Sequence, residues 1–441
     1  MRQLIKNVYI LTMDQDVTVY PTGYLIIEKD RIAEIGQMSE LVYQAEAFEE
    51  VTDGEGGLLI PGLINTHTHL GMIPFRSLGD DVPDRLRRFL FPLEKFMTQE
   101  LAVASGKYAM AEMQLAGVTT FFDMYYFADD LAAAAVTMKS RGIIAETVID
   151  FPTCDSQTAH GGIDYSQNYL PKWLNHELVT PGIAPHAPNT NSEEALIAAS
   201  QLARQYNVPL MIHLAEMDYE ISYFAEKYDL TPVAYLEKIG FLGEHVVAAH
   251  CIFISEADIQ ILKRTGTKVA HCLGANTKSA KGVAPLKALL AAGVPVGLGT
   301  DGPSSGNTLD LFCQMKLVGN MHKTVLKNRS AFPAVEILQL ATNGGAEVLG
   351  MKEQIGSIEV GKKADLVLIE TQSVNMFPLH DPYSVVVYSA NSSNVETVWI
   401  NGAVVVKHKE LVGHKLKGLQ QNLATEMTEF NQEVAKIMTP D

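Results

Sequence analysis

The chain has 441 residues, a length suited to one large domain and a smaller one. Hydrophobic residues make up 47 % and charged residues 19 %, an ordinary globular composition. Its 51 acidic residues outnumber its 34 basic residues, and the net charge of −17 disfavours nucleic acid or an anionic membrane as partner. The four cysteines show no C-x-x-C spacing and are read as reduced thiols. We find no signal-peptide pattern and no apolar run of ~20 residues, and we therefore expect a cytoplasmic protein.

Short runs rich in β-branched and aromatic residues occur at both ends of the chain and predict strands. They cover residues 8–12, 24–28 and 32–36 at one end, and 364–369, 395–400 and 403–406 at the other. Two half-sheets at opposite ends most simply form one small composite β-sandwich domain. We expect this domain at residues 1–60 plus 355–441, with a closing helix at about 414–437.

The middle region, residues 61–354, alternates between short apolar strand candidates and helical patterns, which favours parallel β-α units. The strand candidates lie near 62–69, 117–123, 142–149, 179–186, 208–214, 245–250, 267–272 and 294–301. The helical patterns cover Gln99–Ala116, Leu131–Arg141, Ser192–Tyr206, Thr231–Ile239, Glu256–Arg264 and Val283–Ala292. Eight strands favour a closed (β/α)8 TIM-type barrel, although an open doubly wound sheet fits the same alternation. No pattern predicts the conformation of loops 70–98 and 151–178.

Two histidines stand at the end of the first of these strands, in the segment Asn65-Thr66-His67-Thr68-His69. Side chains two residues apart on a strand point to the same face, so His67 and His69 project together. A pair of imidazoles on rigid backbone forms half of a metal site.

Other polar side chains stand at the ends of later strands in the same way. In a parallel barrel these ends converge on the face that carries the active site. The residues at the ends of the fourth to eighth strands are His186, His213, His250, His271 and Asp301. A metal-dependent active site at this face is therefore the interpretation that explains them together.

The arrangement resembles the amidohydrolase superfamily of metal-dependent barrel hydrolases over nearly the whole chain. The resemblance implies four metal ligands, which are His67, His69, His213 and Asp301. It implies one Zn²⁺ per subunit, with Fe²⁺ as an alternative, because His186 stands where a two-metal site would need a bridging Lys or Glu. Members of the superfamily are often dimeric or larger, so a homo-oligomer is also consistent with the resemblance.

Shorter motifs are similar to the deaminase and chlorohydrolase branch of that superfamily. They include His213-Leu214-Ala215-Glu216, Ala249-His250-Cys251, Gly299-Thr300-Asp301-Gly302, and the segment from His271 to Lys278, where Ala275 replaces the usual Ser. The segments Asn65–His69, Phe122–Tyr125 and Ala184–Pro188 look most like methylthioadenosine/S-adenosylhomocysteine deaminases.

The resemblance implies a hydrolytic deamination in which metal-bound hydroxide attacks a ring carbon that bears an amino group. Asp301 would take the proton of the water, and Glu216 would protonate the adjacent ring nitrogen. His250 would orient the hydroxide. These three residues are the predicted catalytic set.

Four residues are predicted to bind the substrate, a small heterocyclic molecule: Glu94, which matches an acid that accepts ribose hydroxyls, His186, Ser305 and Arg76. The arginine that binds homocysteine in the family would fall near Glu146-Thr147, where this chain has none. This departure disfavours S-adenosylhomocysteine and favours methylthioadenosine or adenosine.

Several other functions remain open from the sequence. A guanine-type or pterin-type base deaminase, a triazine-type chlorohydrolase and a cyclic amide hydrolase would use the same metal and acid. A catalytically inactive metal-binding protein is an alternative of another class, but the joint presence of Glu216 and His250 argues against it. A nucleotide-binding α/β protein would need a phosphate loop, and we find no G-x-G-x-x-G turn after the first strand.

Overall fold

The structure is a computed structural model that describes residues 2–438. Residue 1 and residues 439–441, the outermost parts of the predicted β domain, lie outside the described residues. By its internal contacts the chain divides into two compact units. The first consists of Met1–Asn65, Glu112–Thr120 and Asp310–Gly413, and the second of Thr66–Ala111, Phe121–Leu309 and His414–Asp441. The predicted division into domains at residues 1–60 plus 355–441 and 61–354 stays a prediction.

Strands from both ends of the chain form one mixed sheet, as the sequence predicted. Among the described residues it has nine strands, in the order β17-β16-β15-β14-β5-β1-β2-β3, with β4 also paired to β1. The strands are β1 (Arg2–Leu11), β2 (Val19–Glu28), β3 (Arg31–Gln37), β4 (Glu50–Asp53), β5 (Leu58–Pro61), β14 (Leu366–Ile369), β15 (Val395–Ile400), β16 (Ala403–Lys407) and β17 (Glu410–Leu411). The antiparallel pairing of β5 with β14 joins the two chain ends.

A buried polar contact reinforces this joint between the chain ends. The indole Nε1–H of Trp399, a fully buried side chain, donates to Gln3 Oε1 at 3.2 Å. The amide Nε2 of Gln3 in turn donates to the carbonyl of Gly402 at 2.7 Å. Because these polar groups satisfy one another, the sheet can bury Trp399 in its apolar core without an unpaired donor.

The middle region forms an eight-stranded parallel sheet in the described part of the chain, and all eight predicted strands are confirmed. Its order, β13-β12-β11-β10-β9-β8-β7-β6, follows the sequence, as in a TIM-type barrel. The strands are β6 (Leu63–Thr68), β7 (Val118–Tyr125), β8 (Arg141–Val148), β9 (Val179–Pro185), β10 (Leu210–Leu214), β11 (Val246–His250), β12 (Lys268–His271) and β13 (Val296–Leu298). Strands β7 and β8 are buried at every position, although both contain polar residues: Thr119, Thr120 and Asp123 in β7, and Arg141, Glu146 and Thr147 in β8.

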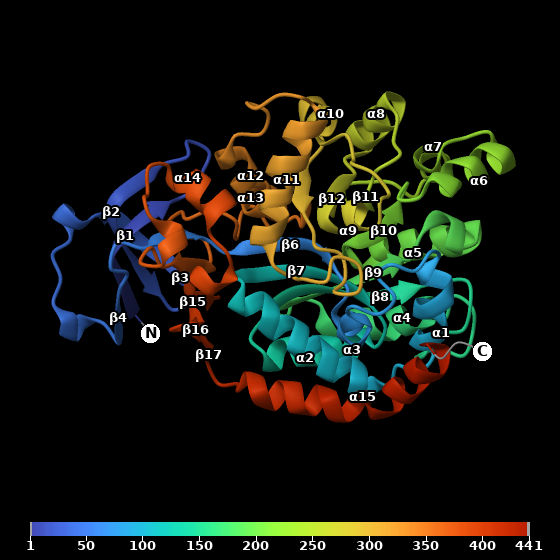
Figure 1. Cartoon of the computed structure of the whole chain (residues 1–441), viewed down its shortest axis with the longest axis horizontal. Helices are drawn as coiled ribbons and strands as arrows, with labels where there is room; N and C mark the ends of the chain where they lie inside the picture. The colour runs from blue at the N-terminus through green and yellow to red at the C-terminus, as the bar shows by residue number, and fades with distance from the viewer. Residues whose placement is uncertain (1, 439–441) are drawn as a thin grey trace. The chain divides into compact units, whose positions relative to one another are not determined.

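Helices lie on the outside of this barrel and separate most of its strands (Figure 1). The six predicted helices are confirmed, within a few residues, as α2 (Gln99–Leu115), α3 (Ala128–Thr137), α5 (Glu193–Tyr206), α7 (Pro232–Lys238), α8 (Glu256–Thr265) and α10 (Leu286–Ala292). Helices that the sequence did not predict are α1 (Phe91–Glu94), α4 (Gly162–Trp173), α6 (Asp218–Tyr228), α9 (Leu273–Lys278), α11 (Leu311–Val325), α12 (Ala334–Ala341), α13 (Asn343–Val348) and α14 (Pro382–Ser384). Short 3₁₀ or π turns occupy Met38–Glu40, Ala45–Ala47, Leu70–Phe75, Leu86–Leu90, Pro188–Thr190, Val374–Met376, Val385–Ser389 and Ser392–Asn394.

Local capping determines where several barrel helices begin and end. At the start of α8, Ser255 accepts from the Asp258 N–H at 3.2 Å, while the Asp258 carboxylate accepts from the Ser255 N–H at 2.8 Å. This capping box satisfies two N–H groups that have no partner inside the helix. The same helix ends at Gly266, whose φ of 73° lies in the left-handed region that glycine adopts without steric cost.

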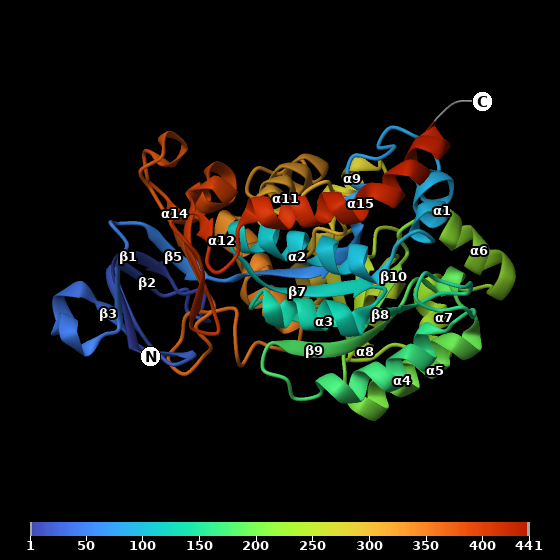
Figure 2. The same ribbon diagram turned by 90° about the horizontal axis from the view of Figure 1, so that it is seen from below.

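The last helix, α15 (Leu416–Met438), confirms the predicted C-terminal helix and groups with the barrel unit by its contacts. It runs alongside α2 and ends near α1 (Figures 1 and 2). Its buried side chains are Leu423 and Phe430, and the Phe430 ring meets Phe75 edge-on with 4.9 Å between centroids. Among the described helices, none is long and apolar enough to cross a membrane.

We predict that Phe430→Ala loosens α15, because the truncation removes a fully buried ring from its contact with Phe75. Loss of a buried Phe side chain costs about 3–5 kcal/mol. Hydrogen exchange should therefore speed up in the amides of α15 while the barrel strands stay protected. Glu429→Ala, at an exposed position of the same helix, is the matched control and should leave exchange unchanged. Equal exchange in both variants would contradict the anchoring role of Phe430.

Candidate active site

Four of the predicted side chains meet at the C-terminal ends of three barrel strands. His67 and His69 stand at the end of β6, His213 lies in β10, and Asp301 follows β13. One ligand atom from each lies within 4.8 Å of the corresponding atom of every other, and all four residues are buried. The structure thus brings together the four residues that the sequence analysis named as metal ligands.

The carboxylate of Asp301 lies at the centre of this group. Its Oδ1 lies 3.0 Å from His69 Nε2 and 3.6 Å from His67 Nε2. The ring of His67 is 4.7 Å from that of His69 and 5.0 Å from that of His213, measured between centroids. Three imidazoles and one carboxylate at this separation form the donor set typical of a divalent metal site.

Carbonyl groups behind the site orient two of the imidazoles. The Nδ1–H of His69 donates to the Met124 carbonyl at 2.6 Å, and that of His213 donates to the His186 carbonyl at 2.7 Å. Each bond leaves the opposite nitrogen, Nε2, with a lone pair that is available to a cation. Such outer partners fix the tautomer and the ring orientation of metal-binding histidines. The residues present therefore fit a bound divalent metal ion.

The backbone at Asp301 is held in an unusual conformation. Its φ of 58° is left-handed, and so is that of His250, at 72°. Non-glycine residues in this region cost of order 1–3 kcal/mol each and cluster at functional sites. The Asp301 N–H donates to the His67 carbonyl at 3.1 Å, and its Oδ1 accepts from the Gly302 N–H at 2.7 Å. These bonds tie the eighth strand to the first and aim the carboxylate.

Burial and charge shift the pKa values of three of the four ligands, all but His69, in the directions that metal binding requires. Burial lowers the pKa of His67 to about 4 and that of His213 well below its ordinary value. Burial alone would raise the pKa of Asp301, but hydrogen bonds from His67 and His69 hold it well below the usual range. For His69, burial is outweighed by the Asp301 carboxylate, which raises the pKa to about 9. The carboxylate therefore attracts positive charge at this point, as a metal ion would supply.

Two predicted catalytic residues form a second group beside the metal ligands. Ligand atoms of Glu216, His250 and Asp301 also lie within 4.8 Å of one another. His250 Nε2 is 3.6 Å from Glu216 Oε1, and His250 Nδ1–H donates to Asn276 Oδ1 at 2.8 Å. The same Glu216 oxygen accepts a hydrogen bond from the ammonium of Lys281.

Lys281 bears on the number of metal ions that this site holds. Although burial raises the pKa of Glu216, the charges of His250 and Lys281 lower it more, so the carboxylate is ionised. The ammonium already supplies the positive charge that a second metal ion would bring to this carboxylate. The geometry therefore agrees with a single metal ion, bound by the first group of residues.

His186 and Glu94, two of the predicted substrate residues, lie near the metal ligands. The ring of His186 is 4.9 Å from that of His213 between centroids, and burial lowers its pKa to about 4. Its Nδ1 contacts Thr190 Oγ1 at 3.0 Å, while that hydroxyl donates to the Ala187 carbonyl at 3.2 Å. Because the hydroxyl proton is used there, His186 Nδ1 is the donor, and its Nε2 remains an acceptor.

Glu94 is half-buried at the end of α1, in the loop whose fold the sequence did not predict. Burial raises its pKa to about 7, against the opposing charge of His69. Aromatic rings line this part of the chain: Phe91 lies 5.3 Å from Phe151 and 6.0 Å from His186 between centroids. Glu94 therefore lies in apolar surroundings close to the metal ligands.

Arg76 and Ser305, the other two predicted substrate residues, lie on loops that follow β6 and β13. The backbone N–H of Arg76 donates to the Ile73 carbonyl at 3.1 Å, and that of Ser305 donates to the Gly302 carbonyl at 2.9 Å. Both side chains are half-buried. Their contacts with a substrate stay predictions.

Sequence reasoning missed three polar residues that hold the site together. Asn276 and Lys281 contact His250 and Glu216 as described above. Arg85 joins the loops after β6 and β13, because its Nη1 donates to the Ser304 carbonyl at 2.7 Å and its Nη2 donates to the Phe75 carbonyl at 3.1 Å. Asn276 stands in a motif that the sequence analysis quoted, whereas no local pattern distinguishes Arg85 or Lys281 from surface cations.

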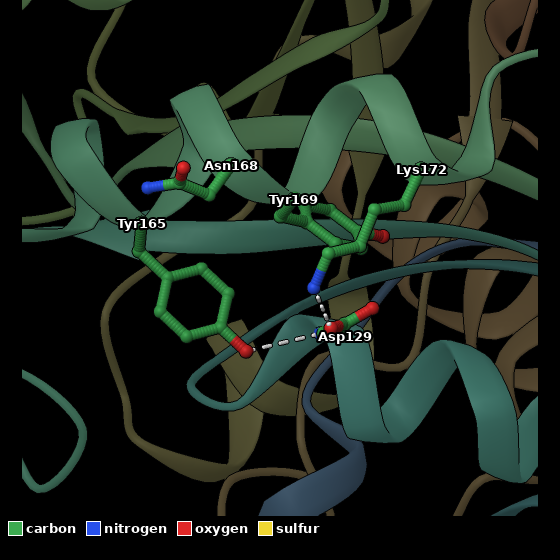
Figure 3. Close-up of a pocket in the computed structure, with 5 residues that line it drawn as sticks. All are labelled: Asp129, Tyr165, Asn168, Tyr169 and Lys172. Atoms are coloured by element: carbon green, nitrogen blue, oxygen red, sulfur yellow. Dashed lines mark hydrogen bonds and ion pairs between the residues drawn. The ribbon is translucent and has the colours of Figure 1, made fainter.

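A separate hollow of about 170 Å³ lies between α3 and α4 and contains none of the predicted site residues (Figure 3). Its lining residues are Asp129, Tyr165, Asn168, Tyr169 and Lys172. Asp129 accepts from Lys172 Nζ at 2.6 Å, and its N–H donates to the Tyr165 hydroxyl at 3.2 Å. The side chains of Asn168 and Tyr169 donate to the carbonyls of Asp164 and Ile144, so each of the five lining residues has a hydrogen-bond partner.

Comparison with known proteins agrees with this geometry. The model of the amidohydrolase family matches residues 58–405, which is most of the chain. The chain belongs to the amidohydrolase family. It is 37 % identical, over 93 % of its length and 94 % of the relative's, to a 5-methylthioadenosine/S-adenosylhomocysteine deaminase of Syntrophobacter fumaroxidans. It is 38 % identical, over 88 % of its length and 89 % of the relative's, to a 5′-deoxyadenosine deaminase of Methanobrevibacter smithii.

Solved structures of amidohydrolase relatives share the fold. An adenosine deaminase of Xanthomonas campestris with bound zinc superposes with a TM-score of 0.93, at 30 % identity over 98 % of both chains. An atrazine chlorohydrolase of Arthrobacter aurescens complexed with zinc has a TM-score of 0.89 at 23 % identity, over 96 % of this chain and 100 % of its own. The family and the deaminase names of its relatives support the predicted enzyme class, a hydrolase that acts on carbon–nitrogen bonds.

We predict that Asp301→Ala removes the bound metal, because it deletes the carboxylate that contacts the Nε2 atoms of His67 and His69. Loss of one ligand from a four-residue set leaves three imidazoles without a compensating charge. Elemental analysis of purified protein should find about one divalent ion per wild-type chain and a small fraction of that in the variant. His186→Ala is the matched control, since His186 is not part of the four-residue group, and it should retain metal. Equal metal content in the wild type and Asp301→Ala would contradict the assignment.

Proposed function

We propose that the protein is a zinc-dependent hydrolytic deaminase of adenine nucleosides, with Fe²⁺ as an alternative metal. One observation carries this proposal: Glu216 and His250 lie beside the metal-ligand group and share Asp301 with it. Activation of a water molecule requires only the metal and its ligands. Protonation of a ring nitrogen requires, in addition, an acid within hydrogen-bonding distance of the substrate. The names of the relatives support the same reaction class.

The residues of the chain account for the proton transfers. The four ligands would hold a zinc ion that lowers the pKa of a bound water molecule, so that this water could lose a proton and act as the nucleophile at neutral pH. Glu216 starts as a carboxylate because His250 and Lys281 hold its pKa below the ordinary value despite burial. It accepts one proton from the attacking water and delivers it to the ring nitrogen beside the carbon under attack. A second proton passes through Asp301 to the amino group, which leaves as ammonia, and His250 orients the water.

The surroundings of Glu94 and His186 favour a nucleoside with an uncharged 5′ substituent. The half-buried Glu94 can accept hydrogen bonds from ribose hydroxyls, and Phe91 and Phe151 provide apolar surface next to it. Where the resemblance would place an arginine for a homocysteine carboxylate, this chain has Glu146, which is fully buried and accepts the Ala128 N–H at 3.1 Å, so the position offers no cation. Methylthioadenosine and 5′-deoxyadenosine fit these features better than S-adenosylhomocysteine, which carries a carboxylate.

Ammonia release by zinc-loaded protein tests the reaction class. The panel contains methylthioadenosine, 5′-deoxyadenosine, adenosine, S-adenosylhomocysteine, guanine and a pterin, with atrazine as a source of chloride. We expect ammonia from the adenine nucleosides, and Glu216→Gln should reduce kcat by about 10²–10⁴-fold because the amide cannot transfer a proton. The variant should keep its zinc, which separates loss of the acid from loss of the metal. Chloride release from atrazine without ammonia from any nucleoside would overturn the proposal.

The role of Glu94 can be tested with paired substrates. At pH 8, above its pKa of about 7, Glu94 is mostly ionised, and Glu94→Gln should then reduce kcat/KM for adenosine by about 10–100-fold, because hydrogen bonds to a charged group contribute about 1.5–3 kcal/mol. The same substitution should have little effect on 2′,3′-dideoxyadenosine, which lacks both ribose hydroxyls. If kcat/KM fell equally for the two nucleosides, Glu94 would not act through hydrogen bonds to the ribose hydroxyls.

A further inference from the structure

A half-buried lysine contacts the carboxylate that transfers the proton in the proposed reaction. The ammonium of Lys281 donates to Glu216 Oε1, and the two side chains are only 20 % and 18 % exposed. The second oxygen, Oε2, accepts no hydrogen bond from the residues that the structure describes. The lysine therefore occupies one oxygen and leaves the other available to a substrate.

One short segment, from Asn276 to Lys281, forms hydrogen bonds to both Glu216 and His250. Asn276, in α9, accepts from His250 Nδ1–H through its side chain at 2.8 Å. Its backbone carbonyl accepts the Lys281 N–H at 2.9 Å, which fixes the turn from which the lysine side chain extends. The turn continues through Gly282, whose φ of 139° other residues rarely adopt. One rigid turn thus places a hydrogen-bonding group on each of the two residues.

We propose that Lys281 is a positioning residue for deamination: it holds the Glu216 carboxylate in the orientation that presents Oε2 to the ring nitrogen. The proposal rests on the proposed function and adds a residue to it. A glutamate side chain has free rotation about its bonds unless a partner restricts it. A misplacement of about 1 Å in a reacting group can cost of order 10²-fold in rate. A lysine bonded to one oxygen restricts this freedom and keeps the carboxylate beside His250.

The lysine is also distinct from the other cations around the site. Lys278, three residues earlier, contacts Asp80 at 2.8 Å and Asn307 at 3.1 Å, and Arg85 bonds to backbone carbonyls. These contacts hold loops together and involve neither proton-transfer residue. Lys281 alone among them touches Glu216, so its removal should affect the chemical step before it affects loop structure.

The test compares Lys281→Met, Lys281→Arg and a matched control, Lys363→Met. Lys363 forms an ion pair with Asp30 in the sheet built by the chain ends and is similarly buried, with 11 % of its side chain exposed. Lys281→Met should lower kcat for the best nucleoside by about 10–100-fold with little change in KM, because orientation of the acid is lost. Lys281→Arg should recover part of the loss, and Lys363→Met should keep the wild-type kcat.

A double-mutant comparison separates positioning from general damage. In the background of Glu216→Gln, Lys281→Met should reduce kcat no further, because the residue that it positions is already gone. A purely structural role predicts that the two losses multiply, and that result would overturn the proposal. Unchanged kcat in Lys281→Met, with activity lost in Glu216→Gln, would also overturn it while leaving the proposed function intact.

Crystal structures of zinc-loaded wild type and Lys281→Met provide a readout that needs no substrate. We expect a single orientation of Glu216 in the wild type and a rotated or multiple orientation in the variant. If no nucleoside is deaminated, the proposed function fails, and these structures still decide whether Lys281 orients the carboxylate. The same Glu216 orientation in both would reject the positioning role.

Discussion

The rest of the site depends on one buried carboxylate, that of Asp301. A carboxylate is costly to bury unless positive charge or hydrogen bonds compensate it. Here the Nε2 atoms of His67 and His69 face one of its oxygens, and the Gly302 N–H donates to that oxygen. The backbone N–H of Asp301 bonds to the His67 carbonyl, so the residue that needs compensation also joins the last strand to the first. The barrel strands therefore hold the Asp301 carboxylate and its hydrogen-bonding partners together.

The barrel, and the grouping of the four candidate metal ligands, could be predicted from the sequence because both leave local patterns. Each strand is a short apolar run, and each ligand stands at the end of such a run, so topology alone brings His67, His213 and Asp301 to one face. The composite sheet was predictable for a similar reason, since strand-like segments remained unpaired at both chain ends. Its joint through Gln3 and Trp399 could not be predicted, because the two residues lie almost 400 positions apart.

The parts that the sequence did not predict depend on contacts between loops. Helix α4 has an amphipathic pattern but contains Pro171, a residue that argues against a helix in a sequence, and α6 mixes polar and aromatic residues. Arg85 and Lys281 have no local signature, because a cation in a loop is usually solvated. Their functions emerge only when the Ser304 carbonyl and the Glu216 carboxylate are seen to face them. Substrate-binding residues are harder to predict from sequence than ligands because they come from such loops.

The charge balance of the site accounts for three carboxylates beside one candidate metal position. Asp301 faces imidazoles that would hold a cation with it, whereas Glu216 has the ammonium of Lys281. Glu94 has no such partner among the described residues, and burial raises its pKa to about 7, so it can remain neutral without a cation. The charge of each acid would thus be compensated differently: by a bound metal ion for Asp301, by the ion pair with Lys281 for Glu216, and by partial protonation near pH 7 for Glu94. The half-buried Lys281 therefore compensates the charge of Glu216 as a second metal ion would, while leaving the other carboxylate oxygen open to the substrate.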